Sequence, residues 1–220
     1  MYDINWLKKH RKVANLLRKP LDLFPENTKV PILQGTLKGK KWILKSGLHE
    51  AWLGTYEFEI REKFEELIQV GDVVYDLGAM VGFYTLLAAE LVKINGKVYA
   101  FEPHPRHIYY LKKNVEINDY RNVIIMEYAI SDRNGEISFD EGRSLSTGHI
   151  AKNGNLVVKT ASLDSLCFKG KIHQPDFIKM DIEGAEYKAL IGAKNILKQK
   201  QPKLLISTHS KKLHTQCCDY

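Results

Sequence analysis

The chain has 220 residues, of which 44% are hydrophobic and 27% are charged. This length suits one sizeable α/β domain with a buried core, and no apolar run approaches the ~20 residues that a membrane-spanning helix needs. The formal net charge is +7, but the lysines are scattered, so we interpret the charge as a solubilising surface rather than a nucleic-acid interface. The three cysteines, Cys167, Cys217 and Cys218, fit neither a disulfide framework nor a zinc site, and the N-terminus lacks an apolar signal core, so we expect a cytoplasmic protein.

The first 53 residues are predicted to form a small helical and hairpin extension of a main domain at residues 54–220. A basic run at residues 8–12 lies in an amphipathic segment that we expect to be a packed helix rather than a membrane anchor. Residues 36–45, with Gly39 in the middle, are predicted to form a hairpin. Thr55 is the expected N-cap of the next helix, whose apolar face carries Ile60, Phe64, Leu67 and Ile68.

Strands and helices alternate from residue 73 onward. Strands are predicted at residues 73–77, 97–101, 123–126, 177–180 and 203–207. Helices are predicted to begin at Phe83 and at Pro105, to run through residues 187–197, and to close the chain at residues 213–220. This alternation predicts a mostly parallel twisted sheet with helices on both faces.

The region between the third and fourth strands is more polar. Asn134-Gly135 and Asn153-Gly154 are typical of tight hairpin turns. The segment at residues 140–152 is rich in glycine and serine, and we predict either a surface loop or a lid there, with no preference between the two.

The most informative feature is the glycine turn that follows the first core strand. Gly78 and Gly82 are separated by three residues, so the turn lacks the G-x-G-x-x-G spacing of dinucleotide-binding folds. Asp76, just before the turn, would repel a pyrophosphate. It suits a cofactor with an amino group and a sulfonium, which points to S-adenosylmethionine.

Polar residues follow the apolar strands at the edge where ligands bind in open parallel sheets. Glu102 closes the second strand, where a carboxylate can accept both hydroxyls of a ribose. Asp181 and Glu183 follow the fourth strand, and His209 follows the fifth. Each has a simpler interpretation as a solvated or helix-capping residue, but their shared position favours one functional site.

Four sequence blocks resemble the FkbM-type methyltransferases. They are the segments at residues 75–79, 101–103, 163–166 and 177–186, and the last of these, which includes Lys-Met-Asp-Ile-Glu-Gly-Ala-Glu, is the most specific. The resemblance covers roughly residues 54–209 and implies a Rossmann-like methyltransferase fold, S-adenosylmethionine as cofactor and a hydroxyl group as methyl acceptor. Met80 departs from the family, which commonly has asparagine there.

The resemblance also implies which residues hold the cofactor. Asp76, Gly78, Ala79, Gly82 and Glu102 should bind it, with Ala129 near the adenine. Tyr56 and Glu57 are predicted to close over the methionine end, although Tyr56 could equally be a buried residue of an amphipathic helix.

A hydroxyl acceptor must be aligned and must lose its proton. Asp181 and His209 are the candidate bases, because neighbouring strands place them at one pocket rim, and Glu183 is expected to orient His209 or to bind the acceptor. No Asp/Asn-Pro-Pro-aromatic motif of amino-methylating enzymes follows the fourth strand, and Asp181 lacks the Asp-Asn pair of metal-dependent enzymes. We therefore predict O-methylation of a small molecule or saccharide without a required metal.

Three alternatives stay open. A nicotinamide-dependent oxidoreductase is disfavoured by the glycine spacing, an inactive cofactor-binding scaffold by the presence of Gly78, Glu102 and Asp181, and an RNA methyltransferase is suggested only by the positive charge. The fold of this family normally finishes with an antiparallel strand pair, whereas the sequence ends at Tyr220, inside the expected last helix. We therefore expect the fifth strand to be an exposed edge that promotes homo-oligomers.

Overall fold

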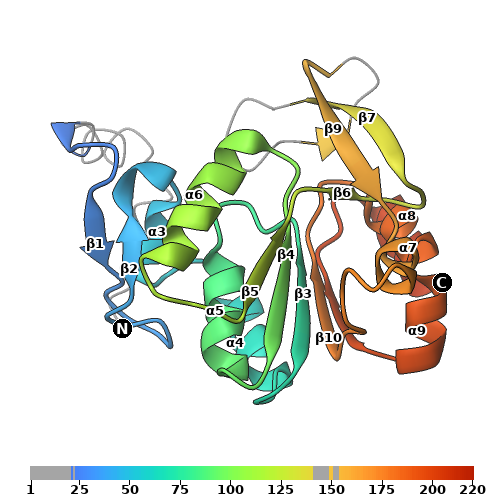
Figure 1. The fold of residues 1–220 in the computed structure, drawn as a ribbon, viewed down its shortest axis with the longest axis horizontal. Coiled ribbons are helices and arrows are strands. Elements are labelled where there is room, and N and C mark those ends of the chain that lie inside the picture. The colour runs from blue at the N-terminus through green and yellow to red at the C-terminus, as the bar shows by residue number, and fades with distance from the viewer. Residues whose placement is uncertain (1–20, 22, 141–148, 151–153) are drawn as a thin grey trace.

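The computed structural model describes residue 21 and residues 23–140, 149–150 and 154–220 (Figure 1). The basic segment at residues 8–12 lies outside these ranges, as does most of the polar segment at residues 140–152. None of the described helices is both long and apolar enough to cross a bilayer.

A five-stranded, fully parallel sheet forms the centre of the molecule, in the order β11-β10-β3-β4-β5. Its strands are β3 (Val73–Leu77), β4 (Lys97–Phe101), β5 (Val123–Met126), β10 (Phe177–Met180) and β11 (Lys203–Ile206). The predicted parallel sheet is confirmed, and only the fifth strand is one residue shorter than expected. The chain leaves β3 toward β4 on one side and later returns to β10 on the other, so a crevice for a ligand opens beyond the ends of β3 and β10.

Helices cover both faces of this sheet, as predicted (Figure 1). One face packs against α4 (Phe58–Leu67), α5 (Phe83–Val92) and α6 (Pro105–Glu116), and the other against α7 (Leu163–Phe168), α8 (Glu186–Ile191) and α9 (Lys194–Lys200). Val74 and Val98 belong to the first core, whereas the next residues, Tyr75 and Tyr99, belong to the second. This is the alternation of side chains that a pleated strand imposes.

The N-terminal hairpin differs from the prediction. It pairs β1 (Lys29–Pro31) with β2 (Lys41–Ile43), so its first strand lies before, not within, residues 36–45. The following elements are the 3-10 helix η2 (Leu44–Ser46) and α3 (His49–Leu53). Because Trp42 and Ile43 are buried in the same core as α5, the hairpin packs directly onto the main domain, and a boundary at residue 53 stays a prediction.

Two helix predictions were wrong in detail. Thr55 does not cap α4; the N-cap position is taken by Glu57, without a side-chain cap. The helix expected over residues 187–197 is divided into α8 and α9 at Gly192. A Cβ on Gly192 would lie 2.1 Å from the backbone oxygen of Ser131. The carbonyl of Gly192 accepts a hydrogen bond from the amide of Asp164. The close approach of these loops therefore interrupts the helix.

A second, smaller sheet was not predicted. Its order is β6-β9-β7-β8, from β6 (Ala129–Ile130), β7 (Gly135–Asp140), β8 (His149–Ile150) and β9 (Leu156–Ala161). The prediction of a tight hairpin at Asn134-Gly135 was wrong, because β9 lies between β6 and β7 and the two strands do not pair with each other. The Asn134 side chain instead accepts a hydrogen bond from the amide of Ser162 and donates one to the hydroxyl of Ser165. The other predicted turn includes Asn153, which lies outside the described residues.

The last element is α10 (Lys211–Cys218), which packs near α8. β11 is an outer strand of the described central sheet, and its Leu204 is partly exposed. Association through this edge stays a prediction.

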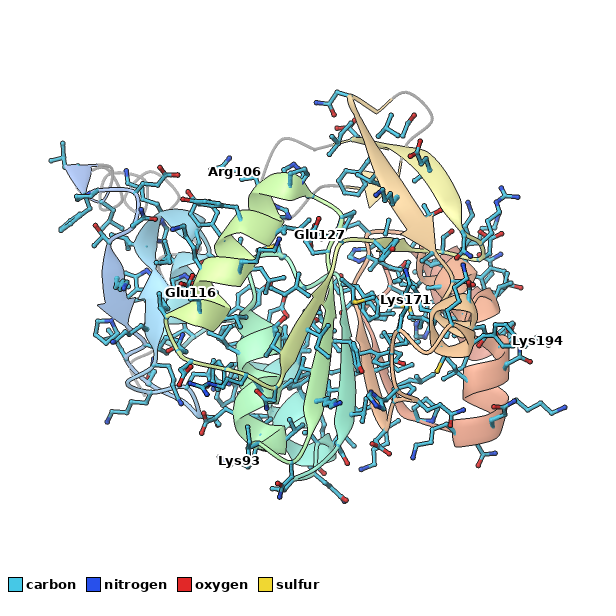
Figure 2. The ribbon with its side chains drawn as sticks, in the orientation of Figure 1. Lys93, Arg106, Glu116, Glu127, Lys171 and Lys194 are labelled. Atoms are coloured by element: carbon cyan, nitrogen blue, oxygen red, sulfur yellow. The ribbon has the colours of Figure 1, made fainter. Side chains whose placement is uncertain are left out.

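Charged side chains are spread over many elements. Figure 2 labels six that are all exposed, and they belong to different parts of the molecule: Lys93, Arg106, Glu116, Glu127, Lys171 and Lys194. Four of them are basic and two are acidic, so both signs of charge occur at the surface, as expected of a solubilising surface.

Candidate active site

A cavity of about 420 Å³ lies beyond the carboxyl ends of β3, β4 and β10. Most of the residues that the sequence predicted as functional line it, although they come from segments far apart in the chain: Tyr56, Glu57, Gly78, Ala79, Glu102, Ala129, Asp181, Glu183 and His209. Two predicted residues, Asp76 and Gly82, do not line the cavity. The cavity is large enough for a small organic ligand.

The glycine loop forms one wall of this cavity. Gly78 has φ +82°, and a Cβ there would lie 1.9 Å from the backbone oxygen of Asp181, so only glycine lets the two loops approach so closely. The amides of Gly78 and Ala79 both donate to the carbonyl of Phe101 at the end of β4, at 3.0 Å each. Gly82, with φ +104°, begins α5 behind the wall. The loop is thus held between the ends of β4 and β10, the two strands that flank β3.

Glu102 fixes the opposite side of the glycine loop. Its Oε2 accepts a hydrogen bond from the amide of Met80 at 2.8 Å, and its Oε1 accepts one from the amide of His104 at 2.9 Å. Nδ1 of His107 lies 3.3 Å from Oε1. A carboxylate has about four acceptor sites, so one is left for a hydroxyl group in the cavity. Glu102 can therefore accept one ribose hydroxyl rather than the two expected, and the ribose contact stays a prediction.

Asp76 lies behind the cavity wall and is fully buried. Its Oδ2 accepts a hydrogen bond from the hydroxyl of Thr85 at 2.7 Å, and its Oδ1 faces Nζ of Lys179 at 3.6 Å. Burial raises the pKa of this carboxyl, and the nearby Lys179 ammonium acts in the opposite direction. Asp76 can therefore influence a ligand only through its neighbours.

Lys179, in the middle of β10, was missed by the sequence interpretation. It is 5% exposed, yet it lines the cavity. Its Nζ lies between Asp76 and Asp181 and 4.9 Å from the centre of the Tyr84 ring. The available signal was a lysine inside an otherwise apolar strand, because such a residue is buried only when it has partners.

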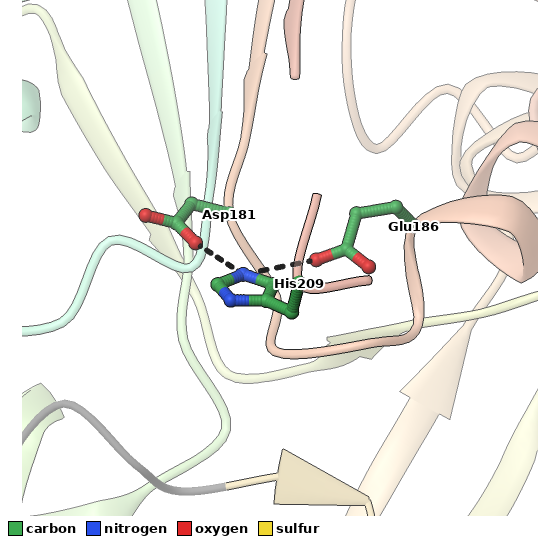
Figure 3. A group of neighbouring side chains, drawn as sticks. All are labelled: Asp181, Glu186 and His209. Carbon is green, nitrogen blue, oxygen red and sulfur yellow. Dashed lines mark hydrogen bonds and ion pairs between the residues drawn. The ribbon is translucent and has the colours of Figure 1, made fainter. Parts of the chain in front are cut away.

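His209 lines the cavity and lies near three carboxylates, two of which, Asp181 and Glu186, are drawn in Figure 3. Its Nε2 is 3.0 Å from Oδ1 of Asp181 and 3.6 Å from Oε1 of Glu186, and its Nδ1 is 3.5 Å from Oε2 of Glu183. The expected proximity of Asp181, Glu183 and His209 is present. Such a group can hold and move a proton.

Glu186, the second residue that the sequence interpretation missed, is fully buried at the start of α8. The amides of Ile182 and Gly184 donate to its carboxylate, which stabilises the turn that carries Glu183. Asp181, Glu186 and His209 also place one ligand atom each within 4.8 Å of one another, a spacing that could accommodate a metal ion.

Tyr56 and Glu57 form the wall before α4. The hydroxyl of Tyr84 donates to Oε2 of Glu57 at 2.9 Å, and the Tyr56 ring packs edge-on against Phe83 and Tyr84. Burial, followed by the charge of Glu57, raises the pKa of the Tyr56 hydroxyl, which therefore stays protonated. Tyr56 precedes α4 rather than lying on its apolar face, so it is available to the cavity.

Comparison of the sequence with models of protein families identifies the family that has this arrangement of loops. A sequence model described as the methyltransferase FkbM domain matches residues 76–217, which include the glycine loop, Glu102 and the β10 block. The chain belongs to the FkbM methyltransferase family. The methyltransferase fold expected from the resemblance is confirmed.

Two curated relatives are similar in sequence to part of this FkbM chain. Hexuronic acid methyltransferase AglP from Haloferax volcanii is 32% identical over 128 residues, which cover 57% of this chain and 52% of AglP. The 2-O-methyltransferase NoeI from Sinorhizobium fredii is 27% identical over 164 residues, which cover 65% of this chain and 66% of NoeI. The matched region thus spans about half of one relative and about two thirds of the other.

A solved structure supports the fold. Methyltransferase FkbM from Methylobacillus flagellatus aligns with 80% of this chain and 46% of its own, at a TM-score of 0.50 and 18% identity. At this identity, the similarity supports the architecture of the FkbM chain and not its substrate.

Proposed function

We propose that this protein transfers a methyl group from S-adenosylmethionine to a hydroxyl group of a saccharide. The observation that carries the proposal is one cavity with two chemically different sides. The glycine loop and Glu102 provide a wall for a nucleoside, and Asp181, Glu183 and His209 provide a polar mouth for a hydroxyl acceptor. When bound, S-adenosylmethionine supplies an electrophilic methyl group.

The cofactor side fits a ribose and an adenine. Glu102 is held in place by two backbone amides and keeps one acceptor site for a ribose hydroxyl. Ala129, Ile130 and Phe139 line the cavity beyond Glu102 and give an apolar surface for the purine ring. Gly78 and Ala79 keep the loop free of bulky side chains near the ligand.

The acceptor side can take up the hydroxyl proton. Only one ring nitrogen of a neutral imidazole carries a hydrogen. The 3.0 Å contact between Nε2 of His209 and Oδ1 of Asp181 needs a hydrogen between the two atoms, so the Nε2–H donates to Asp181. Asp181, held in this way by His209, is then the base that takes up the hydroxyl proton, and Glu183, 3.5 Å from Nδ1, lines the acceptor side of the cavity. Alignment of the acceptor with the methyl group supplies the rest of the acceleration.

The acceptor class is proposed from the relatives. The name of one gives hexuronic acid as its substrate, and the name of the other gives 2-O-methylation. A saccharide hydroxyl, with a carboxylated sugar as the first choice, is consistent with both and with a base at the cavity mouth. Cytoplasmic location and the absence of a required metal stay predictions.

The experiment has a binding arm and a transfer arm. Calorimetry should detect S-adenosylhomocysteine but not NAD, because the glycine spacing does not suit a pyrophosphate. Methyl-labelled S-adenosylmethionine is then offered with free uronic acids, neutral sugars, oligosaccharides and an RNA control, and products are identified by mass spectrometry. NAD binding without S-adenosylhomocysteine binding would refute the proposal.

Two variants connect transfer to the site. Asp181→Asn and His209→Asn should each reduce kcat by roughly 10²–10⁴-fold, the range of general-base catalysis, with little change in S-adenosylhomocysteine affinity. His214→Asn is the matched control, because His214 lies on α10 and does not line this cavity. Cofactor binding with no transfer to any acceptor offered would favour an inactive scaffold.

A further inference from the structure

The ammonium group of Lys179 is a buried cation with loose partners. Its Nζ lies 3.6 Å from Oδ1 of Asp76 and 3.9 Å from Oδ2 of Asp181. Both distances exceed the 2.7–3.2 Å of an N–H···O hydrogen bond. An ammonium has three N–H donors, and burying them without close acceptors is unfavourable.

The carboxylate of Asp76 also lacks a close hydrogen-bond partner on one of its two oxygens in the described part of the chain. Among the described residues, its Oδ1 has no hydrogen-bond partner, although the atom is buried. Asp76 and Lys179 are direct cross-strand partners in the register of β3 and β10, so the backbone fixes their separation. Asp76 therefore holds the ammonium from behind, while the Lys179 side chain reaches the cavity.

The charge of the cavity wall indicates what Lys179 would bind. Among the described lining residues, Lys179 is the only lysine or arginine, whereas Glu57, Glu102, Asp181 and Glu183 are acidic. The cofactor carries an ammonium, a sulfonium and one carboxylate. The acidic residues suit the ammonium and the sulfonium of the cofactor. Besides the histidines His107 and His209, Lys179 is the one basic side chain among the described lining residues that suits its carboxylate.

We infer that Lys179 binds a carboxylate in the cavity, and that this is the carboxylate at the methionine end of the cofactor. The inference rests on the proposed function. Lys179 lies next to Tyr84, whose hydroxyl bonds Glu57, on the wall where the methionine end was expected from the sequence. This wall is formed by β10 and α5, whereas Glu102 and Ala129, assigned to the ribose and adenine, follow β4 and β5.

A carboxylated sugar acceptor offers the same chemistry from a second source. Lys179 is only 5% exposed. Asp181 contacts both Lys179 and His209, and the side chains of Asp181 and His209 are more accessible to solvent than that of Lys179. An acceptor that enters at the mouth reaches Asp181 and His209 before Lys179. The depth of the ammonium thus favours the cofactor as the source.

The test compares ligands that differ only at the methionine end. Calorimetry on the full chain would measure S-adenosylhomocysteine, 5′-methylthioadenosine, which lacks the amino-acid portion, and decarboxylated S-adenosylmethionine. Lys179→Met should weaken S-adenosylhomocysteine binding by roughly 10- to 100-fold, the range of a charge-assisted hydrogen bond. It should leave the affinities of the other two ligands within about twofold. Lys179→Arg should recover part of the loss, because it keeps the charge.

Controls keep the result interpretable. Lys194→Met removes an exposed lysine of α9 and should change none of the affinities. Because Lys179→Met leaves Asp76 buried beside an apolar chain, the double variant Asp76→Asn/Lys179→Met is measured in parallel. It removes the lone buried charge and should show the same selective loss, with a folded protein confirmed by circular dichroism.

Several outcomes would overturn the inference. Equal losses for S-adenosylhomocysteine and 5′-methylthioadenosine would mean that Lys179 only supports the fold of the cavity. Unchanged S-adenosylhomocysteine affinity with a raised KM for carboxylated, but not neutral, acceptors would assign Lys179 to the acceptor instead. If the unmodified protein bound none of the three ligands, the proposed function itself would fail.

Discussion

The replacement of Gly78 by alanine tests how the glycine loop builds the cavity. The new Cβ would lie 1.9 Å from the backbone oxygen of Asp181. Real Cβ contacts stay above 3.0 Å, so one of the two loops must move by about 1.1 Å, the difference between these values. Asp181 is a proposed base, and a displacement of ~1 Å at a reacting group can cost ~100-fold in rate.

The stability cost of Gly78→Ala has two parts. A residue with a Cβ at φ +82° costs about 1–2 kcal/mol. Steric overlap with a backbone atom adds about 1–3 kcal/mol, because the backbone cannot rotate away as a side chain can. The free energy of unfolding should therefore fall by about 2–5 kcal/mol, and kcat/KM by ~100-fold or more.

Gly71→Ala is the matched control. Gly71 has a similar φ of +93°, but a Cβ there would have no neighbour within 4 Å. Urea denaturation should show only the conformational cost of about 1–2 kcal/mol, with cofactor affinity unchanged. If Gly78→Ala lost no more stability than Gly71→Ala and kept full activity, close approach to Asp181 would not be the reason for a glycine at this position.

Three further predictions follow from other contacts. Glu102→Gln places an amide NH₂ against the backbone N–H of Met80 or of His104, so calorimetry should show roughly 10- to 100-fold weaker S-adenosylhomocysteine binding; unchanged affinity would exclude the ribose role. Burial raises the pKa of Glu90, but hydrogen bonds from Lys40, Lys93 and Tyr120 outweigh it and lower that pKa to about 2. The stability that this ionised carboxylate contributes is present above pH ~4.5 and is lost as the pH falls toward 2. Between pH 5 and 3, Glu90→Gln should therefore lose less free energy of unfolding than the unmodified protein. An equal loss in the two proteins would contradict the assignment. Methyl transfer should persist in excess EDTA, because Nε2 of His209 already lies within hydrogen-bond distance of Asp181; a loss that Mn²⁺ restores would assign Asp181, Glu186 and His209 to a cation instead.

The central sheet could be predicted from sequence because each strand carries its own local signal. β4, β5 and β10 are short runs of apolar and β-branched residues that end at a polar residue, a proline or a turn. β4 and β10 are buried on both faces and read as nearly continuous apolar runs, so their limits are visible without knowledge of their neighbours, and the partly exposed β5 is entirely apolar as well. The positions of Glu102, Asp181 and His209 followed from these limits, since parallel strands end at one edge.

The small sheet could not be predicted in this way. β6 has only two residues, and its partner β9 begins at Leu156, beyond β7 and β8 in the chain. The Asn134-Gly135 pair gave the local signal of a hairpin, but long-range pairing of β9 with both β6 and β7 overrode it. Turn propensity is a weak preference that tertiary packing can reverse.

The two residues missed in the site share one physical cause. Lys179 and Glu186 are charged side chains that are almost fully buried. Their burial depends on partners that the sequence does not place beside them, such as Asp76, which is 103 positions before Lys179 and pairs with it only through the β3–β10 register. A charged residue in an apolar strand can be noticed in the sequence, but its partner cannot be assigned before the strand order is known.

The cavity is also where the backbone is least relaxed. Seven described residues other than glycine have positive φ angles, and four of them, Leu48, Glu57, Met80 and Glu183, line this one cavity. Each such residue costs of order 1 kcal/mol or more, so their concentration needs a compensating gain. Glu57, Met80 and Glu183 lie at the starts of three different walls, before α4, within the glycine loop and before α8. A left-handed residue turns the chain sharply at each place, and this lets three segments that are distant in sequence converge on one ligand. The buried core beneath these turns offsets the conformational cost, so Glu57, Met80 and Glu183 can take strained backbone positions while the apolar residues of the strands keep relaxed ones.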